Sequence, residues 1–213
     1  MTKLKFWYDP GSCSLAPYIL FRELGLDVET IHVTDYSSSG LGLINPKLRV
    51  PVLSIDDEII TEVPAILTVL VHLASPDRKL LGKTLIETAR VYEWMNWISG
   101  QLHGSGFGCL WRSERYSDDT SALESIKAKG RLNVIAAYAF IETRLGGLHA
   151  VGDAFTVVDL YLLVFYRWAF HIGLEMEKDY PKYTALIANL VKRDAVVKTL
   201  EEMKLPPVFA PKV

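Results

Sequence analysis

The sequence is poor in cysteine, has no long apolar run and shows no marked excess of charge of either sign. Its 213 residues include only two cysteines, Cys13 and Cys109, which are too few for a disulfide framework and are typical of a reducing compartment. We therefore expect a cytoplasmic protein. With 23 basic and 25 acidic residues the formal net charge is -2, which predicts no binding to nucleic acid or to an acidic membrane surface.

The apolar runs are too short to predict a membrane span. The most apolar stretch, residues 157–170, carries two charged residues and is shorter than the roughly 20 residues that a span requires, so it predicts a buried helix of the core. Lys3, Asp9 and Pro10 interrupt the N-terminal region, so we expect no signal peptide. The histidines show no close metal-ligand spacing, and the sequence predicts no metal site.

The rest of the chain is organised around residues 9–17, Asp-Pro-Gly-Ser-Cys-Ser-Leu-Ala-Pro. Alternating apolar residues predict a strand that leads into this segment, and helical spacing predicts a helix that follows it and ends at Gly25. Because Pro17 is tolerated only in a first helical turn, the helix should begin near Cys13 or Ser14. A thiolate of Cys13, or of a bound thiol ligand, would be stabilised there by unpaired amides. The alternative is a small buried cysteine that packs the joint.

The first 78 residues predict a small mixed sheet. Alternating apolar residues predict four strands, at residues 4–8, 28–33, 52–55 and 59–61. A helix separates the first two strands, which makes that pair parallel, whereas a polar turn joins the last two into an antiparallel hairpin. Pro51 stands at the entrance of the third strand, where a cis peptide bond is one option. A further helix should run from Pro64 to about Leu73.

Beyond this sheet the sequence predicts only helices. The polar segment 75–79 is the clearest break, and we expect domains at residues 1–78 and 84–213. Helical spacing predicts long helices at residues 85–103, 120–145, 156–170 and 183–203, with the first fraying in the glycine-rich run 104–108. Thr156 and Asp159 have the spacing of a capping box, so Asp159 is assigned to folding and not to catalysis.

This order of elements resembles the cytosolic glutathione S-transferase family, and the resemblance reaches individual motifs. It rests on segments at residues 10–17, 45–51, 61–66, 94–103 and 155–168, which follow the family's order along essentially the whole chain. The first, Pro-Gly-Ser-Cys-Ser-Leu-Ala-Pro, is similar to the signature of the bacterial beta class. The resemblance implies an N-terminal thioredoxin-like βαβ-ββα domain that binds glutathione, followed by an all-helical domain that contributes the electrophile site.

The resemblance also implies functions for individual residues. Cys13 would meet the glutathione sulfur, with Ser12 and His103 as the other catalytic residues. The residues implied for glutathione binding are Tyr8, Ser14, Arg49, Val50, Pro51, Glu62, Val63 and Asn96. Glu62 can pair with the ammonium group of glutathione, while amides from Val63 onward, at a helix start, can bind its carboxylate.

Ordinary structural functions remain open for several of these residues. Ser12 and Ser14 are also typical helix caps, and Glu62 is typical of a first helical turn. A lone histidine such as His103 is usually structural, and Tyr8 has the pattern of a core aromatic residue. Tyr8 is otherwise the alternative hydroxyl donor to the sulfur.

Four residues, in three places, depart from the family's pattern. Leu48-Arg49 stands where the family often has Gly-Gln, and Val63 replaces a frequent Ser or Gly. Gly104 follows His103 where beta-class proteins tend to carry a lysine. These changes remove two side-chain contacts with glutathione and one positive charge, and they favour a specialised substrate.

The sequence therefore predicts a glutathione transferase that activates the glutathione thiol for attack on an electrophilic, mainly apolar small molecule. Its setting would be detoxification or specialised metabolism, and the resemblance implies a homodimer. The electrophile pocket could be lined by aromatic residues, namely Phe107, Trp111, Tyr116 and Trp168. The alternative is that these side chains pack in the hydrophobic core. Glutathione-dependent isomerisation, thiol transfer, and a non-catalytic binding or assembly module remain as alternative functions.

Overall fold

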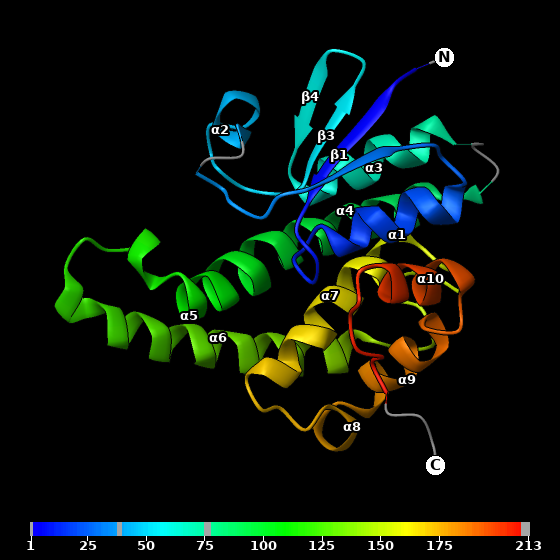
Figure 1. The fold of residues 1–213 in the computed structure, drawn as a ribbon. Coiled ribbons are helices and arrows are strands. Elements are labelled where there is room, and N and C mark those ends of the chain that lie inside the picture. Colours follow the sequence, from blue (N-terminus) through cyan, green and yellow to red (C-terminus); the bar gives the residue numbers. More distant parts are fainter. Residues whose placement is uncertain (1, 38–39, 75–77, 210–213) are drawn as a thin grey trace.

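The computed structural model describes residues 2–37, 40–74 and 78–209, and Figure 1 shows its arrangement. The strands that these residues form are β1 (Leu4–Tyr8), β2 (Glu29–His32), β3 (Val52–Ile55) and β4 (Glu58–Thr61), in the order β2-β1-β3-β4. As predicted, β1 pairs with β2 in parallel and β3 with β4 antiparallel. β1 also pairs antiparallel with β3, so that β1 lies inside the sheet.

Helices cover both faces of this sheet. Those of the first half are α1 (Leu15–Leu24), α2 (Leu41–Ile44) and α3 (Val63–Leu73). Phe6 and Leu53 pack on the face that shares its core with α1 and α3, whereas Val52 packs on the opposite face with Leu41 of α2. α1 begins directly after Ser14 and ends at Gly25, which adopts a left-handed conformation (φ 68).

The second half of the chain is helical throughout its regular elements. These are α4 (Leu85–Trp97), the π-helix η2 (Ile98–Gly108), α5 (Cys109–Trp111), the 3-10 turns η3 (Ser113–Arg115) and η4 (Thr120–Ala122), α6 (Leu123–Arg144), α7 (Val157–His171), α8 (Met176–Asp179), α9 (Pro181–Leu190) and α10 (Asp194–Glu202). α7 begins with the predicted capping box of Thr156 and Asp159, and most of its side chains are buried. The predicted fold class, a thioredoxin-like domain followed by an all-helical domain, is confirmed.

The predicted fraying at residues 104–108 is wrong, because the chain continues through this run as the π-helix η2. Its glycines permit close packing: a Cβ atom on Gly106 would lie 2.9 Å from Cγ2 of Val134 in α6, and one on Gly108 would lie 2.4 Å from the hydroxyl of Tyr116. Glycine weakens a helix, but close packing against neighbouring elements keeps this segment helical.

The predicted single helix over residues 183–203 is also wrong, since α9 and α10 are separate. Arg193 leaves the helical conformation (ψ 131) and its guanidinium binds the carboxylate of Glu23 in α1 at 2.5 Å. The short helix α8 was not predicted. Residues 75–77, which carry part of the predicted domain break, lie outside the described residues.

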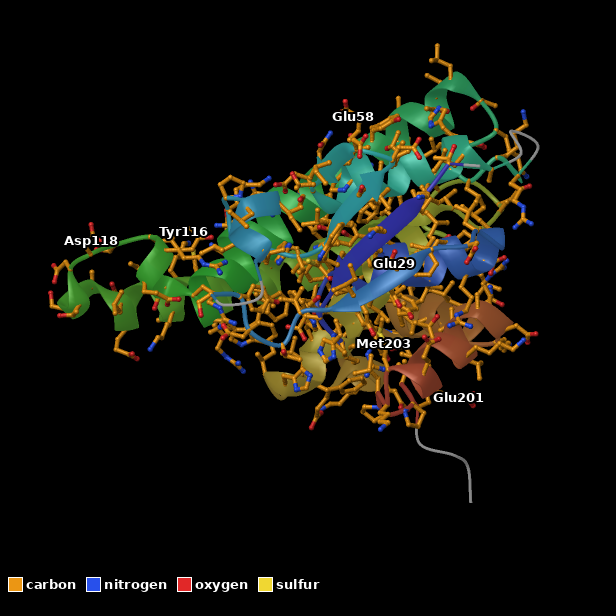
Figure 2. All side chains as sticks on the ribbon, turned by 45° about the horizontal axis from the view of Figure 1, so that its top comes forward. Glu29, Glu58, Tyr116, Asp118, Glu201 and Met203 are labelled. Carbon is orange, nitrogen blue, oxygen red and sulfur yellow. The ribbon has the colours of Figure 1, made fainter. Side chains whose placement is uncertain are left out.

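The two halves share one continuous apolar core. Trp168 of α7 donates a hydrogen bond from Nε1 to the carbonyl oxygen of Gly11 at 2.8 Å, which ties the loop before α1 to the helical half. Figure 2 shows Tyr116 and Asp118 on an arm that projects away from Glu201 and Met203 at the α10 end. Among the described helices, none combines the length and apolar content needed to cross a membrane.

Candidate active site

The loop between β1 and α1 opens onto two adjoining cavities, and Cys13 lines both of them. One, of about 280 Å³, is also lined by Glu62 and Val63 at the start of α3, and we call it the Glu62 cavity. The other, of about 570 Å³, is also lined by Trp111 and Trp168, and we call it the Trp111 cavity. The residues that line both are Cys13, Arg49, Val50, His103, Gly108 and Arg115.

Cys13 holds its proton at neutral pH. Its side chain is 7% exposed, and Sγ donates a weak hydrogen bond to the carbonyl oxygen of Val50 at 3.7 Å. The pKa of the Cys13 thiol is raised to about 12. Burial is the largest cause, and the negative charges of Glu62 and Asp9 contribute in the same direction. Burial therefore disfavours a thiolate of Cys13 in the protein without a ligand, and it favours the other form of the prediction, in which a bound thiol ligand carries the charge.

The two serines beside Cys13 bind each other. Ser12 donates from Oγ to Oγ of Ser14 at 2.8 Å and accepts the Ser14 amide at 3.2 Å. Ser12 lines the Trp111 cavity, whereas Ser14 is completely buried and lines neither cavity. Ser14 thus fixes the orientation of the Ser12 hydroxyl from behind.

Two other predicted site residues lie outside both cavities. The ring centre of Tyr8 lies 4.9 Å from that of Tyr18 and 5.5 Å from that of His32, so Tyr8 belongs to a cluster of aromatic rings. Asn96 is exposed on α4. Neither Tyr8 nor Asn96 therefore lines either cavity.

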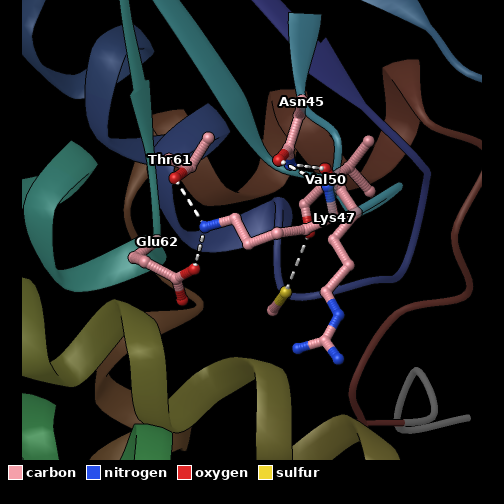
Figure 3. A network of polar contacts seen from close by, with 7 residues as sticks. Asn45, Lys47, Val50, Thr61 and Glu62 are labelled. Carbon is pink, nitrogen blue, oxygen red and sulfur yellow. Dashed lines mark hydrogen bonds and ion pairs between the residues drawn. The ribbon is translucent and has the colours of Figure 1, made fainter. Parts of the chain in front are cut away.

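The segment before β3 has a fixed shape that turns the Val50 carbonyl toward Cys13 (Figure 3). The peptide bond between Val50 and Pro51 is cis. Asn45 donates from Nδ2 to the carbonyl oxygen of Arg49 at 2.7 Å, and its Oδ1 accepts the amide of Lys47 at 3.2 Å. This small network closes the turn and brings the Arg49 side chain to the mouth of both cavities.

Glu62 combines an unusual backbone conformation with a charged partner. Its φ is 72, a value that costs a residue with a side chain about 1–3 kcal/mol. Lys47 binds Oε1 of Glu62 at 2.5 Å and Oγ1 of Thr61 at 2.8 Å (Figure 3). Glu62 directly precedes α3, which begins at Val63, and its side chain caps none of the helix amides. A carboxylate and the positive end of a helix are thus neighbours along the chain for an amino-acid end of a ligand.

His103 reaches both cavities from η2 and is neutral. Its ring lies 5.3 Å from Trp168 and 5.6 Å from Phe165. Burial, and then the positive charge of Arg49, lower the pKa of His103 to about 4. At neutral pH its imidazole can donate or accept a hydrogen bond but carries no charge.

Sequence reasoning missed three residues that line the cavities. Tyr161 of α7 brings a buried hydroxyl to the Glu62 cavity, and burial raises its pKa well above the ordinary value. Arg115 lines both cavities and Arg112 the Trp111 cavity. Tyr161 is hidden in the apolar run of α7, but two arginines three residues apart beside Trp111 are a signal that the sequence contains. Within the described residues, no three His, Cys, Asp or Glu side chains converge as metal ligands.

Comparisons with known proteins agree with this geometry. The chain matches the family models described as glutathione S-transferase, N-terminal domain, over residues 17–78 and glutathione S-transferase, C-terminal domain, over residues 108–194. The glutathione S-transferase GstA of Escherichia coli O157:H7 is 34% identical over 187 residues, which cover 82% of this chain and 86% of that protein.

Solved structures share the whole arrangement. A glutathione transferase homologue from Sulfitobacter, solved with bound glutathione, has a TM-score of 0.88 at 27% identity and covers 95% of this chain and 99% of its own. The beta-class enzyme of Sphingomonas chungbukensis has a TM-score of 0.82 at 28% identity, with 95% and 100% covered. With the match to GstA extending over most of both sequences, the chain belongs to the glutathione S-transferase family.

Proposed function

We propose that this protein is a glutathione transferase, which joins the sulfur of glutathione to an electrophilic, mainly apolar small molecule. The observation that carries the proposal is the meeting of two unlike cavities at Cys13, one with the charged groups of Glu62 and α3, the other with aromatic walls. The Sulfitobacter relative with bound glutathione supports glutathione as the co-substrate.

Glutathione would lie along the first half of the chain. Its γ-glutamyl ammonium pairs with Glu62 and its γ-glutamyl carboxylate with the amides at Val63, at the positive end of α3. The backbone of Val50, before cis Pro51, lies beside Cys13 and suits the cysteinyl part of the ligand. Arg49 supplies a positive charge at the mouth.

In the reaction, the glutathione thiol gives its proton to water, and the resulting thiolate forms a bond to the electrophilic carbon. The leaving group departs with the electron pair of the bond that breaks. Because Cys13 keeps its proton, its Sγ–H would donate a hydrogen bond to the glutathione sulfur instead of attacking. Neutral His103 lines both cavities and can orient the thiolate, and Ser12 can do so from the Trp111 cavity once its hydroxyl turns away from Ser14.

Tyr8, Ser14 and Asn96 have no direct contact with glutathione in this proposal, since they line neither cavity. The high pKa of Cys13 disfavours thiol transfer, which needs a cysteine thiolate to form a mixed disulfide. We therefore propose conjugation and not thiol transfer as the main activity.

The setting of this activity is also a proposal. Two free cysteines and the family support a cytoplasmic enzyme of detoxification or specialised metabolism. We further propose a homodimer and the domain division at residues 1–78 and 84–213. The dimer is supported by the exposed aromatic surface of α4 and α6, where Phe140 is 41% exposed and its ring lies 4.6 Å from that of Trp97.

Calorimetry with glutathione tests the proposal directly. We expect binding at millimolar ligand, and about ten-fold weaker binding in Glu62→Gln because the charge-assisted pair with the ammonium group is lost. Glu58→Gln is the matched control, since Glu58 is an exposed residue of the same hairpin, and it should leave the affinity unchanged. Absence of binding at millimolar glutathione would instead favour a non-catalytic module.

A further inference from the structure

The Trp111 cavity has an aromatic wall formed by three rings in mutual contact. The ring of Phe107 lies 4.6 Å from that of Trp111 and 5.1 Å from that of Trp168, and Trp111 and Trp168 lie 5.1 Å apart. The rings are tilted against one another, with interplanar angles of 48°, 76° and 57°, so a planar ligand can stack on the face of one ring at a time. The wall alone would suit any neutral aromatic molecule.

Positive charge distinguishes this cavity from a purely apolar one. Arg49, Arg112 and Arg115 all line it, and among the described residues none of these three side chains forms an ion pair. Arg112 donates from Nη1 to the carbonyl oxygen of Trp111 at 2.8 Å, which holds its guanidinium near the aromatic wall. The carboxylate among the lining residues is Asp9, which already accepts a hydrogen bond from Tyr36 at 2.9 Å.

The three guanidinium groups repel one another. Partial burial, and then the charges of Arg49 and Arg112, lower the pKa of Arg115. Arg49 and Arg115 likewise contribute to the lowered pKa of His103. A bound anion would relieve this repulsion, and a planar carboxylate matches the paired donors of a guanidinium group.

Glutathione does not account for this cluster. The ammonium and carboxylate of its γ-glutamyl end are assigned to Glu62 and Val63, which line only the Glu62 cavity. Arg49 and Arg115 line both cavities, and either of them is available to the glycyl carboxylate. Arg112, in contrast, lines only the Trp111 cavity, where the second substrate would lie.

We infer that the second substrate is an aromatic electrophile that carries a carboxylate, bound by Arg112 and Arg115 with its ring against Trp111. The inference rests on the proposed function and narrows its substrate from apolar molecules in general to aromatic acids. It also gives a physical reason for two exposed arginines at the mouth of an otherwise aromatic cavity.

A matched pair of probes tests the inference: 4-chloro-3,5-dinitrobenzoate and its primary amide. In both, the glutathione thiol proton goes to water, sulfur forms a bond to the ring carbon that carries chlorine, and chloride leaves with the bonding electrons. Each kcat/KM is divided by the uncatalysed rate constant with glutathione at the same pH, which removes the difference in ring reactivity. We expect a normalised kcat/KM at least ten-fold higher for the benzoate.

Variants assign this preference to the arginines. Arg112→Gln and Arg115→Gln should each lower kcat/KM for the benzoate about ten-fold, while changing that for the amide less than two-fold. Lys198→Gln removes the same charge from α10, which lies far from the arm that carries Tyr116 (Figure 2), and should change neither value. An equal preference for the amide, or equal losses for both probes, would overturn the inference.

Binding measurements separate this inference from the proposed function. The unreactive 3,5-dinitrobenzoate should quench the fluorescence of Trp111 and Trp168 and bind about ten-fold more weakly to Arg112→Gln, whereas glutathione should bind that variant as it binds the wild type. If Arg112→Gln loses glutathione affinity and keeps benzoate affinity, the arginines serve glutathione and the inference fails alone. If glutathione does not bind the wild type, the proposed function fails, and the inference fails with it.

Discussion

At Cys13, burial outweighs the electrostatic effect of a helix start. Amides and the helix dipole stabilise a nearby anion by about 0.3–2 kcal/mol, but loss of hydration around a buried thiolate costs more, so the pKa rises to about 12. The amides of Ser12, Ser14 and Leu15 already donate hydrogen bonds within the loop, which leaves few free donors to offset that cost. Cys13 therefore contributes to the site through its proton and its shape.

The reactivity of Cys13 toward iodoacetamide tests this ionisation state. Because only the thiolate reacts, a pKa of about 12 predicts alkylation at pH 7.5 roughly a thousand-fold slower than for an ordinary cysteine. Mass spectrometry of the Cys13 peptide over time measures the rate, and urea-denatured protein supplies the reference. Equal rates in the folded and denatured protein would show that Cys13 ionises freely.

His103 gives a second prediction at this scale. Its folded pKa of about 4 lies below the ordinary value of 6.5, so its neutral form is favoured by folding. The corresponding stability is present above pH 6.5 and is lost as the pH falls from 6.5 toward 4. NMR titration of the imidazole should give a midpoint near 4 that rises in Arg49→Gln, since a positive neighbour is removed. A wild-type midpoint near 6.5 would contradict the burial of this ring.

The sequence was sufficient to predict many of the residues that line the cavities, but not which of them carry a charge. The family resemblance implied that Cys13, Pro51 and Glu62 belong to the site, and all three line the Glu62 cavity. Ionisation depends on burial by residues distant in sequence, so the protonated state of Cys13 could not be predicted. Tyr161 was missed for a similar reason, since a buried tyrosine in an apolar helix has no distinguishing pattern.

At the scale of elements, the position of α5 depends on a glycine in α6. A Cβ atom on Gly130 would lie 2.6 Å from the amide nitrogen of Leu110 and 2.9 Å from Cβ of Cys109. Backbone atoms cannot yield as a flexible side chain can, so α5 would have to shift. Because α5 ends at Trp111, that shift would alter the aromatic wall of the Trp111 cavity.

We expect Gly130→Ala to lower the free energy of unfolding by about 1–3 kcal/mol, despite the better helix propensity of alanine. Gly100→Ala is the control, because a Cβ atom there meets nothing within 4 Å, and it should be neutral or stabilising. Urea denaturation followed by circular dichroism measures both. A neutral Gly130→Ala would mean that α5 moves at little cost.

Element prediction succeeded where periodicity was clear and failed where long-range contacts decide. The strands, α1, α3 and the start of α7 follow from apolar spacing, turns and caps. The break before α10 depends on the reach of Arg193 to Glu23, 170 residues away in sequence. The π-helix depends on packing against α6, which spacing within residues 98–108 does not encode.

At the scale of the molecule, the site exists only where the two halves are docked. Each cavity is lined by residues from both halves, and two of the contacts that join the halves lie near the two ends of α1. Trp168 binds the carbonyl of Gly11 at one end, and Arg193 binds Glu23 at the other while its guanidinium carbon lies 4.1 Å from the ring centre of Phe155. Docking of the two halves thus fixes the position of Glu62 relative to the aromatic wall.

The proposed homodimer gives the prediction for the whole assembly. Phe140 of α6 lies 4.6 Å from Trp97 and 6.1 Å from Trp94, and the guanidinium of Arg144 lies 5.8 Å from the Phe140 ring centre. Phe140 is exposed and Trp97 is half-buried, whereas Trp94 lies buried beneath them, and such an aromatic patch with a charged rim is typical of the centre of a protein interface. Phe140→Glu should therefore convert a dimer into a monomer in sedimentation experiments, because a carboxylate would be desolvated without a partner.

Val197→Glu is the matched control for this change. Val197 is 40% exposed on α10 and Phe140 is 41% exposed on α6, so the two substitutions introduce the same charge at similar accessibility. The control should remain a dimer. A dimeric Phe140→Glu protein would exclude this surface as the contact, whereas a wild-type monomer would exclude the dimer itself. Both Phe140 and Trp97 lie outside the two cavities, so the monomer should still bind glutathione.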